Sequence, residues 1–407
     1  MFVRLVMWFF VRYFRITARI PRQVAQINEP YLLLANHFGR YDPFILSYFI
    51  GKPPHFISSD AILRDWPIGS FFKGLGAIPK KKGFRDTRVV RDMRTVVQAG
   101  GALALFPEGT RTWAGDTLYI DPAVAKLVRL LGVPVITARM QGAYAFDPRW
   151  ASPLRRARVV IDYELTLTKE EVRQLTEEEA YKKITQRLSH NDIEWLRQHR
   201  VLIGSGRRAE HIGKIIFQCP QCKSFAGFKS HKNRFVCRHC QLPITIDEYG
   251  FFTAPVKLPF DNPYKWFYWQ ADNFITEMLK QLTLTRDTPL FEIERAVITR
   301  TKGAGRMQKM GTGSLAFYPD HLCITLPGHR ITFKHRDIDY LGPQYMERLE
   351  MFEGDYAWRF TPQYPDESGV KWELAINTAW ALAGQHTKLA PYWRERILQR
   401  IQRVREN

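Results

Sequence analysis

The stretch YLLLANHFGRYDP at residues 31–43 decides the fold of the N-terminal part of the chain. Its first five residues form an apolar run of the type found in buried β-strands. Asp42 and the proline after it are typical of a helix start, which predicts a helix over 44–50. Because Gly39 permits a turn, Asp42 could accept a hydrogen bond from one nitrogen of His37 and leave the other nitrogen free to take a proton. Alone, this short pattern also fits a structural histidine.

A second segment, at residues 72–88, is rich in glycine, proline and cations. Such a loop could bind a phosphate group, although a solvated basic loop would have the same composition. Its five cationic candidates are Lys80, Lys81, Lys82, Arg85 and Arg88.

Residues 102–111 repeat the first pattern, since the apolar run ALALF ends in the turn PEGTR. Arg111 could bind a phosphate through two hydrogen bonds, and Glu108 could accept from a hydroxyl group or hold a cation. A third apolar run at 133–137 follows a helical stretch at 123–131. Because strands alternate with helices, we predict an α/β domain with a mostly parallel sheet, whose loops at the carboxyl ends of the strands gather these polar residues.

The order NHxxxxD, a basic GxIP loop, FPEGTR and VPVI resembles the glycerolipid acyltransferase family, typified by 1-acylglycerol-3-phosphate acyltransferases. The resemblance implies that His37 is a general base, that Asp42 assists it, and that a glycerol hydroxyl attacks a fatty acyl thioester without a catalytic cofactor. The implied donor is acyl-CoA or an acyl carrier protein, and the implied product is phosphatidic acid. The implied substrate-binding residues are Lys82, Arg85, Glu108, Gly109, Thr110 and Arg111.

The chain departs from the family pattern at Lys82, where an arginine is usual. A lysine keeps the charge but lacks the planar fork of a guanidinium group, so Arg85 or Arg88 is expected to share the phosphate contact. The same motifs serve several acceptors. Glycerol 3-phosphate or another lysolipid is therefore an alternative acceptor.

The N-terminal segment 1–20 combines many apolar and aromatic residues with arginines and has no acidic residue. On one continuous helix, Arg4, Arg12, Arg15 and Arg19 would share a wedge of roughly 80°. This pattern predicts an amphipathic helix in segment 1–28 that lies in the membrane interface and binds membrane lipids at the cytoplasmic face. The alternative is a helix packed on the protein's own core. We expect neither a transmembrane span nor secretion.

Four of the five cysteines form two CxxC pairs, Cys219 with Cys222 and Cys237 with Cys240. Two tight turns that offer four thiolates suit a tetrahedral zinc ion, and a full set of protein ligands indicates a structural role. We therefore predict an acyltransferase domain at 29–208 and a zinc ribbon at 209–255. A small β-rich domain should follow at 256–407.

The C-terminal region offers a helix at 265–281, several strand candidates and a basic final helix at 392–403. The strand candidates are 296–301, 314–318, 321–326, 330–334, 357–360 and 371–376. A small antiparallel barrel or sandwich with a helix fits this order, but the acyltransferase resemblance assigns no role to the region.

The chain of 407 residues carries a formal charge of +20, which predicts an anionic partner. A zinc-ribbon protein that binds nucleic acid is a second class of function consistent with this charge. That reading leaves the NHxxxxD and FPEGTR motifs and the apolar N-terminus without a role, so nucleic acid is the less favoured partner. A non-catalytic scaffold is disfavoured because the motif residues are all present. The sequence does not set the oligomeric state.

Overall fold

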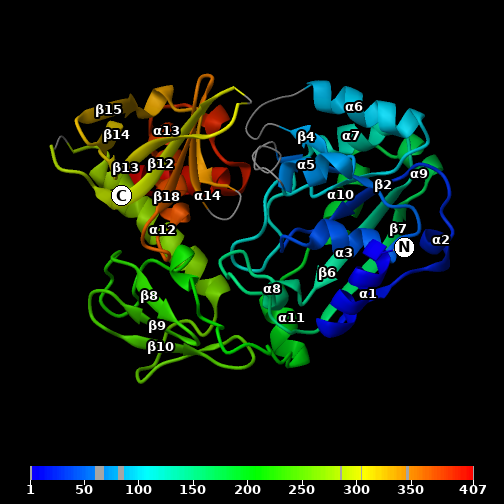
Figure 1. Ribbon diagram of the computed structural model, residues 1–407, viewed down its shortest axis with the longest axis horizontal. Coiled ribbons are helices and arrows are strands. Elements are labelled where there is room, and N and C mark those ends of the chain that lie inside the picture. The colour runs from blue at the N-terminus through cyan, green and yellow to red at the C-terminus, as the bar shows by residue number, and fades with distance from the viewer. Residues whose placement is uncertain are drawn as a thin grey trace. The chain divides into compact units, whose positions relative to one another are not determined.

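A computed structural model describes residues 2–59, 68–80, 87–284, 287–303, 305–344 and 348–406. The chain forms two compact units (Figure 1). The first contains Met1–Arg208 and Ile246–Phe251, and the second contains Ala209–Thr245 and Phe252–Asn407. Most of the predicted ribbon and all of the predicted C-terminal domain therefore lie in one unit.

The first unit alternates strands and helices along most of its length. Its elements are α1 (Phe2–Tyr13), β1 (Ile16–Arg19), α2 (Arg22–Ala25), β2 (Leu32–Ala35), α3 (Asp42–Phe49), β3 (His55–Ser59), α5 (Ile68–Gly74), β4 (Ile78–Lys80), α6 (Thr87–Gln98), β5 (Leu103–Leu105), α7 (Ala123–Leu131), β6 (Val135–Gln141), α8 (Ala143–Phe146), β7 (Val159–Leu167), α9 (Lys169–Gln174), α10 (Glu177–Leu188) and α11 (Asp192–His199).

The described strands of this unit form one sheet in the order β1-β7-β6-β2-β5-β3-β4. Five adjacent strands of this sheet are parallel to one another, namely β6, β2, β5, β3 and β4. Strand β7 is antiparallel to β6. Strand β2 is central and buried on both faces, which explains its uninterrupted apolar sequence. The predicted α/β class with a mostly parallel sheet is confirmed.

One face of the sheet is covered by α6, α7, α9 and α10, whose apolar sides form a continuous core with the strands. The ends of these helices are set by their sequence. Thr168 and Glu171 form a capping box at the start of α9, and Thr176 and Glu179 form another at the start of α10. On the sheet, Tyr163 of β7 donates to the carbonyl oxygen of Leu46 and so holds α3.

The N-terminal helix is shorter than predicted. It ends at Tyr13, and Arg15 adopts a positive φ of 57°, which breaks the helix. Residues 16–19 then form β1, which pairs in parallel with β7. The prediction of one continuous helix through residue 20 is therefore wrong, and of the four arginines in the expected wedge only Arg4 and Arg12 lie on the helix.

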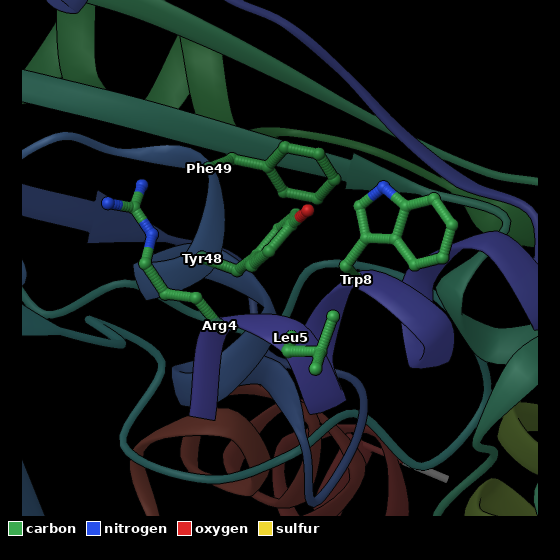
Figure 2. Close-up of a pocket in the computed structure, with 5 residues that line it drawn as sticks. All are labelled: Arg4, Leu5, Trp8, Tyr48 and Phe49. Carbon is green, nitrogen blue, oxygen red and sulfur yellow. The ribbon is translucent and has the colours of Figure 1, made fainter. Parts of the chain in front are cut away.

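Helix α1 packs one side on its own domain and exposes the other. Phe10 and Phe14 contact Phe146, with ring centroids 6.0 and 5.1 Å away. The exposed large side chains are Leu5, Val6, Trp8, Phe9 and Tyr13. A groove of about 670 Å³ lies between α1 and α3. Figure 2 shows the residues that line it, which are Arg4, Leu5, Trp8, Tyr48 and Phe49. Within the described residues, no helix combines the length and apolar character needed to cross a bilayer.

The second unit contains a small sheet, a larger sheet and three long helices. Its elements are a 3-10 turn (Ile212–Lys214), β8 (Phe228–His231), β9 (Arg234–Cys237), β10 (Pro243–Ile246), β11 (Phe252–Thr253), α12 (Pro263–Gln281), β12 (Phe291–Lys302), β13 (Gln308–Phe317), β14 (His321–Leu326), β15 (His329–Lys334), β16 (Tyr340–Pro343), β17 (Leu349–Glu353), β18 (Tyr356–Pro362), α13 (Gly369–Leu382) and α14 (Pro391–Glu406), with further 3-10 turns at His335–Asp337 and His386–Lys388.

The larger sheet is antiparallel, in the order β15-β14-β13-β12-β18-β17-β16, which confirms a β-rich C-terminal domain. One predicted strand is wrong, because residues 371–376 lie inside α13. This helix is buried on nearly all sides, so its sequence lacks the one-sided periodicity that marks a surface helix. Strands β16 and β17 were not predicted.

Candidate active site

His37 and Asp42 meet at the carboxyl end of the central strand β2. Nδ1 of His37 lies 2.9 Å from Oδ2 of Asp42, and the same oxygen accepts hydrogen bonds from the backbone N–H groups of Phe38 and Gly39 at 2.8 and 2.9 Å. Asp42 is the first residue of α3 and is buried. The predicted turn therefore exists, and it brings the two side chains into direct contact.

This contact sets the chemistry of the imidazole. Because a carboxylate only accepts hydrogen bonds, the proton of a neutral His37 lies on Nδ1 and Nε2 carries the lone pair. Burial lowers the pKa of His37 below its usual value, and the charges of Arg111 and Arg149 act in the same direction against the opposing contact with Asp42. The ring stacks on Phe106 at a centroid distance of 3.9 Å, and 20% of the side chain is exposed. His37 is thus a neutral base with a fixed tautomer.

Glu108 has a different position from the one expected of a substrate ligand. It is 6% exposed, and its two carboxyl oxygens accept from the backbone N–H groups of His37 at 2.9 Å and of Leu118 at 2.7 Å. Burial raises its pKa well above the usual value, although these two hydrogen bonds oppose the rise. In this structure Glu108 links the backbone of His37 to the loop after β5.

The rest of the PEGTR turn lies beside this contact. Gly109 has a φ of 69°, so a side chain would be strained there. The hydroxyl oxygen of Thr110 accepts from Nη1 of Arg149 at 3.0 Å, and the same nitrogen donates to the carbonyl oxygen of Arg111 at 2.9 Å. Both Arg111 and Arg149 are close enough to act on the charge of His37. The turn therefore supplies one cation that acts on the imidazole, Arg111, and binds a second, Arg149.

The two predicted phosphate ligands of the basic loop, Lys82 and Arg85, lie outside the described residues. Lys80, which precedes them, ends β4 and is exposed. Strand β4 runs parallel to β3 at the end of the sheet, so Lys80 lies at the same carboxyl edge as the histidine motif.

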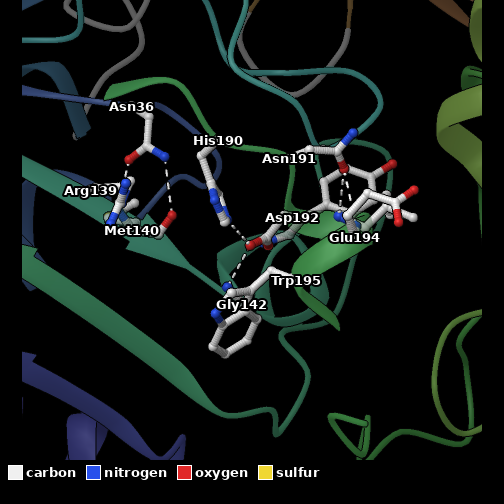
Figure 3. A network of polar contacts seen from close by, with 12 residues as sticks. Asn36, Arg139, Met140, Gly142, His190, Asn191, Asp192, Glu194 and Trp195 are labelled. Atoms are coloured by element: carbon white, nitrogen blue, oxygen red, sulfur yellow. Dashed lines mark hydrogen bonds and ion pairs between the residues drawn. The ribbon is translucent and has the colours of Figure 1, made fainter. Parts of the chain in front are cut away.

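The structure also brings in polar residues that were not assigned to the site from the sequence (Figure 3). Asn36 exchanges two hydrogen bonds with the backbone of Met140 and joins the ends of β2 and β6. Asp192 accepts from the N–H groups of Gly142 and Tyr144 at 2.6 and 2.7 Å and contacts Nε2 of His190 at 2.8 Å. No short motif marks Asp192, because the two backbone N–H groups that it binds lie about fifty residues away.

Arg149 was not predicted from the sequence either, and the structure buries it against an aromatic ring. Its guanidinium carbon lies 3.3 Å from the ring centroid of Trp113, and the side chain is almost fully buried. A desolvated cation over an aromatic face is held firmly. Arg149 follows Pro148 in an irregular segment, where the sequence gives no signal for a site.

The four cysteines of the CxxC pairs converge in the second unit. Their sulfur atoms all lie within 4.8 Å of one another, with Cys219 and Cys240 at 3.7 Å and Cys222 and Cys237 at 3.8 Å. Zinc–sulfur bonds of about 2.3 Å in a tetrahedron would separate the sulfurs by roughly 3.8 Å. The donor set and its spacing therefore fit a single metal ion.

Residues 15–141 match the family model named Acyltransferase, so this part of the chain is an acyltransferase domain. The family resemblance noted from the sequence is confirmed for this domain, which includes the histidine and PEGTR motifs. Among curated proteins, the chain is similar to a probable 1-acyl-sn-glycerol-3-phosphate acyltransferase of Mycoplasma genitalium, with 24% identity over 143 residues. That match covers 34% of this chain and 53% of the relative, so the chain spans about half the length of the relative.

Among solved structures, the chain is similar to PlsC of Thermotoga maritima, a 1-acyl-sn-glycerophosphate acyltransferase. The sequence identity is 17%, the TM-score is 0.38, and the match covers 46% of this chain and 78% of that one.

Proposed function

We propose that this chain transfers a fatty acyl group from an acyl thioester to the free hydroxyl of a 1-acylglycerol-3-phosphate-like acceptor, giving phosphatidic acid. The observation that carries the proposal is the contact of His37 with Asp42, which leaves Nε2 of a neutral imidazole as the basic atom within an acyltransferase domain. The family description of the domain supports acyl transfer. The printed name of the Mycoplasma relative supports the acceptor.

The reaction follows from these groups. Nε2 of His37 removes the proton of the acceptor hydroxyl as its oxygen attacks the thioester carbonyl carbon. The new C–O bond gives a tetrahedral oxyanion, which the charges of Arg111 and Arg149 stabilise. When the C–S bond breaks, the imidazolium returns its proton to the leaving thiolate. Asp42 stabilises the transient imidazolium and stays ionised throughout.

The acceptor phosphate is proposed to bind at the basic carboxyl edge of the sheet. Arg111 follows β5 at this edge, and Lys82 and Arg85 are proposed to complete the phosphate site. Gly109 and Thr110 shape the turn that presents Arg111. Glu108 serves this site by holding the backbone of His37, because both its oxygens already accept backbone hydrogen bonds.

The acyl donor is proposed to be acyl-CoA or an acyl carrier protein, and the reaction to take place at the cytoplasmic face of a membrane. Helix α1 supports this location, since it carries exposed apolar side chains together with Arg4 and Arg12 and has no acid in its first turn. Such a surface favours an interface with anionic lipids.

The cysteine cluster is proposed to bind one structural zinc ion. The residues that would hold it are Cys219, Cys222, Cys237 and Cys240. A bound zinc would cross-link the two knuckles, and the strand β9 that ends at Cys237 would be fixed by it. No catalytic step involves this metal site.

The test is acyl transfer by purified protein on vesicles that contain a panel of lysolipids, with acyl-CoA and acyl carrier protein offered separately. We expect phosphatidic acid from the phosphorylated acceptor, and His37→Ala should lower kcat by about 10²- to 10⁴-fold. His199→Ala is the matched control, because that histidine is exposed on α11. Near-normal transfer by the His37 variant would refute the mechanism, and a preferred acceptor without phosphate would refute the substrate.

A further inference from the structure

We propose that Asp147 is a positioning residue for the acyl transfer described above, because it holds Arg40 and thereby the turn that joins His37 to Asp42. The inference rests on the proposed function. Asp147 lies beyond residues 15–141, the segment that matches the family model.

The contact between Asp147 and Arg40 has three hydrogen bonds. Oδ2 of Asp147 accepts from the backbone N–H of Arg40 at 2.7 Å and from its Nε at 3.4 Å, and Oδ1 accepts from its Nη2 at 2.7 Å. The Asp147 side chain is completely buried, whereas that of Arg40 is 30% exposed. A buried carboxylate depends strongly on its partners, so this pair constrains the backbone at residue 40.

The two carboxylates, Asp42 and Asp147, both bind the backbone of the turn. The N–H groups of Phe38 and Gly39 donate to Asp42, and the next N–H group, that of Arg40, donates to Asp147. A Cβ atom at Gly39 would lie 2.7 Å from Oδ2 of Asp147 and 3.1 Å from Oδ1 of Asp42. The turn therefore has glycine where the carboxylates approach most closely, and its conformation depends on both acids.

Asp147 is itself held firmly. It follows α8, and its N–H donates to the carbonyl oxygen of Ala143 at 2.9 Å. The start of α8 is fixed by the buried Asp192, which accepts from Gly142 and Tyr144 (Figure 3). A continuous set of hydrogen bonds thus runs from α11 through α8 to the histidine turn. Loss of the Asp147 carboxylate should loosen the geometry between His37 and Asp42 without removing any catalytic group.

The test compares Asp147→Asn and Arg40→Ala with the wild-type protein by kinetics and by proton NMR of the His37 Nδ1–H, assigned with His37→Ala. In both variants we expect kcat to fall on the order of 10- to 100-fold, the KM of the acceptor to change less than twofold, and the Nδ1–H signal to shift or exchange away. The double variant should be no slower than the slower single variant, because the two side-chain hydrogen bonds lost in Arg40→Ala are part of the contact that Asp147→Asn weakens. Asp162→Asn is the matched control. This acid lies on β7 and pairs with Arg19 of β1 and Arg139 of β6, so its replacement should leave all three readouts unchanged.

Wild-type kcat with an unchanged Nδ1–H signal in a folded Asp147→Asn protein would overturn the inference. A higher acceptor KM at unchanged kcat in Arg40→Ala would also overturn it, because Arg40 would then be a substrate ligand. If Asp147→Asn does not fold, Arg40→Ala decides the question alone, since its side chain is partly exposed. The NMR signal requires no turnover, so a wild-type protein without acyl transfer would refute the proposed function and leave the positioning contact to be judged separately.

Discussion

Glu108 offers a sharp test of how the site is built. Its carboxylate accepts hydrogen bonds from the backbone N–H groups of His37 and Leu118 and has little exposed surface. Replacement by alanine leaves two buried donors without a partner, at about 1–3 kcal/mol each, so the local free energy of opening should fall by about 2–6 kcal/mol. Glutamine keeps one acceptor oxygen but turns an NH₂ group toward the other donor, and about half of that loss is expected.

The assay is native-state hydrogen exchange at the amides of His37 and Leu118 in the wild-type, Glu108→Gln and Glu108→Ala proteins. Protection should decrease in that order, because exchange reports local opening. kcat should fall with it, since the backbone of His37, the proposed general base, is released. Unchanged protection at both amides, combined with a raised KM for the acceptor alone, would refute this reasoning and return Glu108 to the role of a substrate ligand.

Three further outcomes are expected. Because burial lowers the pKa of His37, its imidazole stays neutral to a lower pH, and the acid limb of kcat/KM should lie below the ordinary histidine value near 6.5; a limb at or above that value in a pH–rate profile would contradict the burial. Elemental analysis should find one zinc ion per wild-type chain, which Cys222→Ser should lose and Cys323→Ser, in a buried strand position, should keep; equal zinc in both variants would contradict the site. Phe9 is 61% exposed, so Phe9→Ser should weaken binding to anionic phospholipid vesicles by about tenfold in a sedimentation assay. Val297→Ser is the exposed control, and equal weakening in both variants would contradict membrane binding by α1.

The histidine turn could be predicted because its determinants are local. A buried strand, a glycine and a helix-starting Asp42 lie within a few residues of His37, and each has a characteristic pattern. The parallel sheet could be predicted from local patterns as well, since apolar runs such as 102–106 end in polar turns. By contrast, Asp147 contacts Arg40 across 107 residues, and an isolated carboxylate gives no sign of a distant partner.

Two errors in secondary structure have separate physical causes. In α13 the side chains are buried all around the helix, so apolar residues at alternate positions from Trp372 to Ile376 looked like a strand. At the N-terminus the apolar and basic composition continues past Tyr13, but pairing of β1 with β7 outweighs helix propensity over residues 16–19. Tertiary contacts decided both cases.

The short segment Ile246–Phe251 interrupts the second unit along the chain, because it belongs to the first. There, Glu248 accepts from the N–H of Ile203 at 2.7 Å and Phe251 lies under the guanidinium group of Arg197 at 4.1 Å. A chain cut at Arg208 would therefore lack part of its own acyltransferase unit. Any shortened chain that keeps the first unit whole must retain residues 246–251 together with residues 1–208.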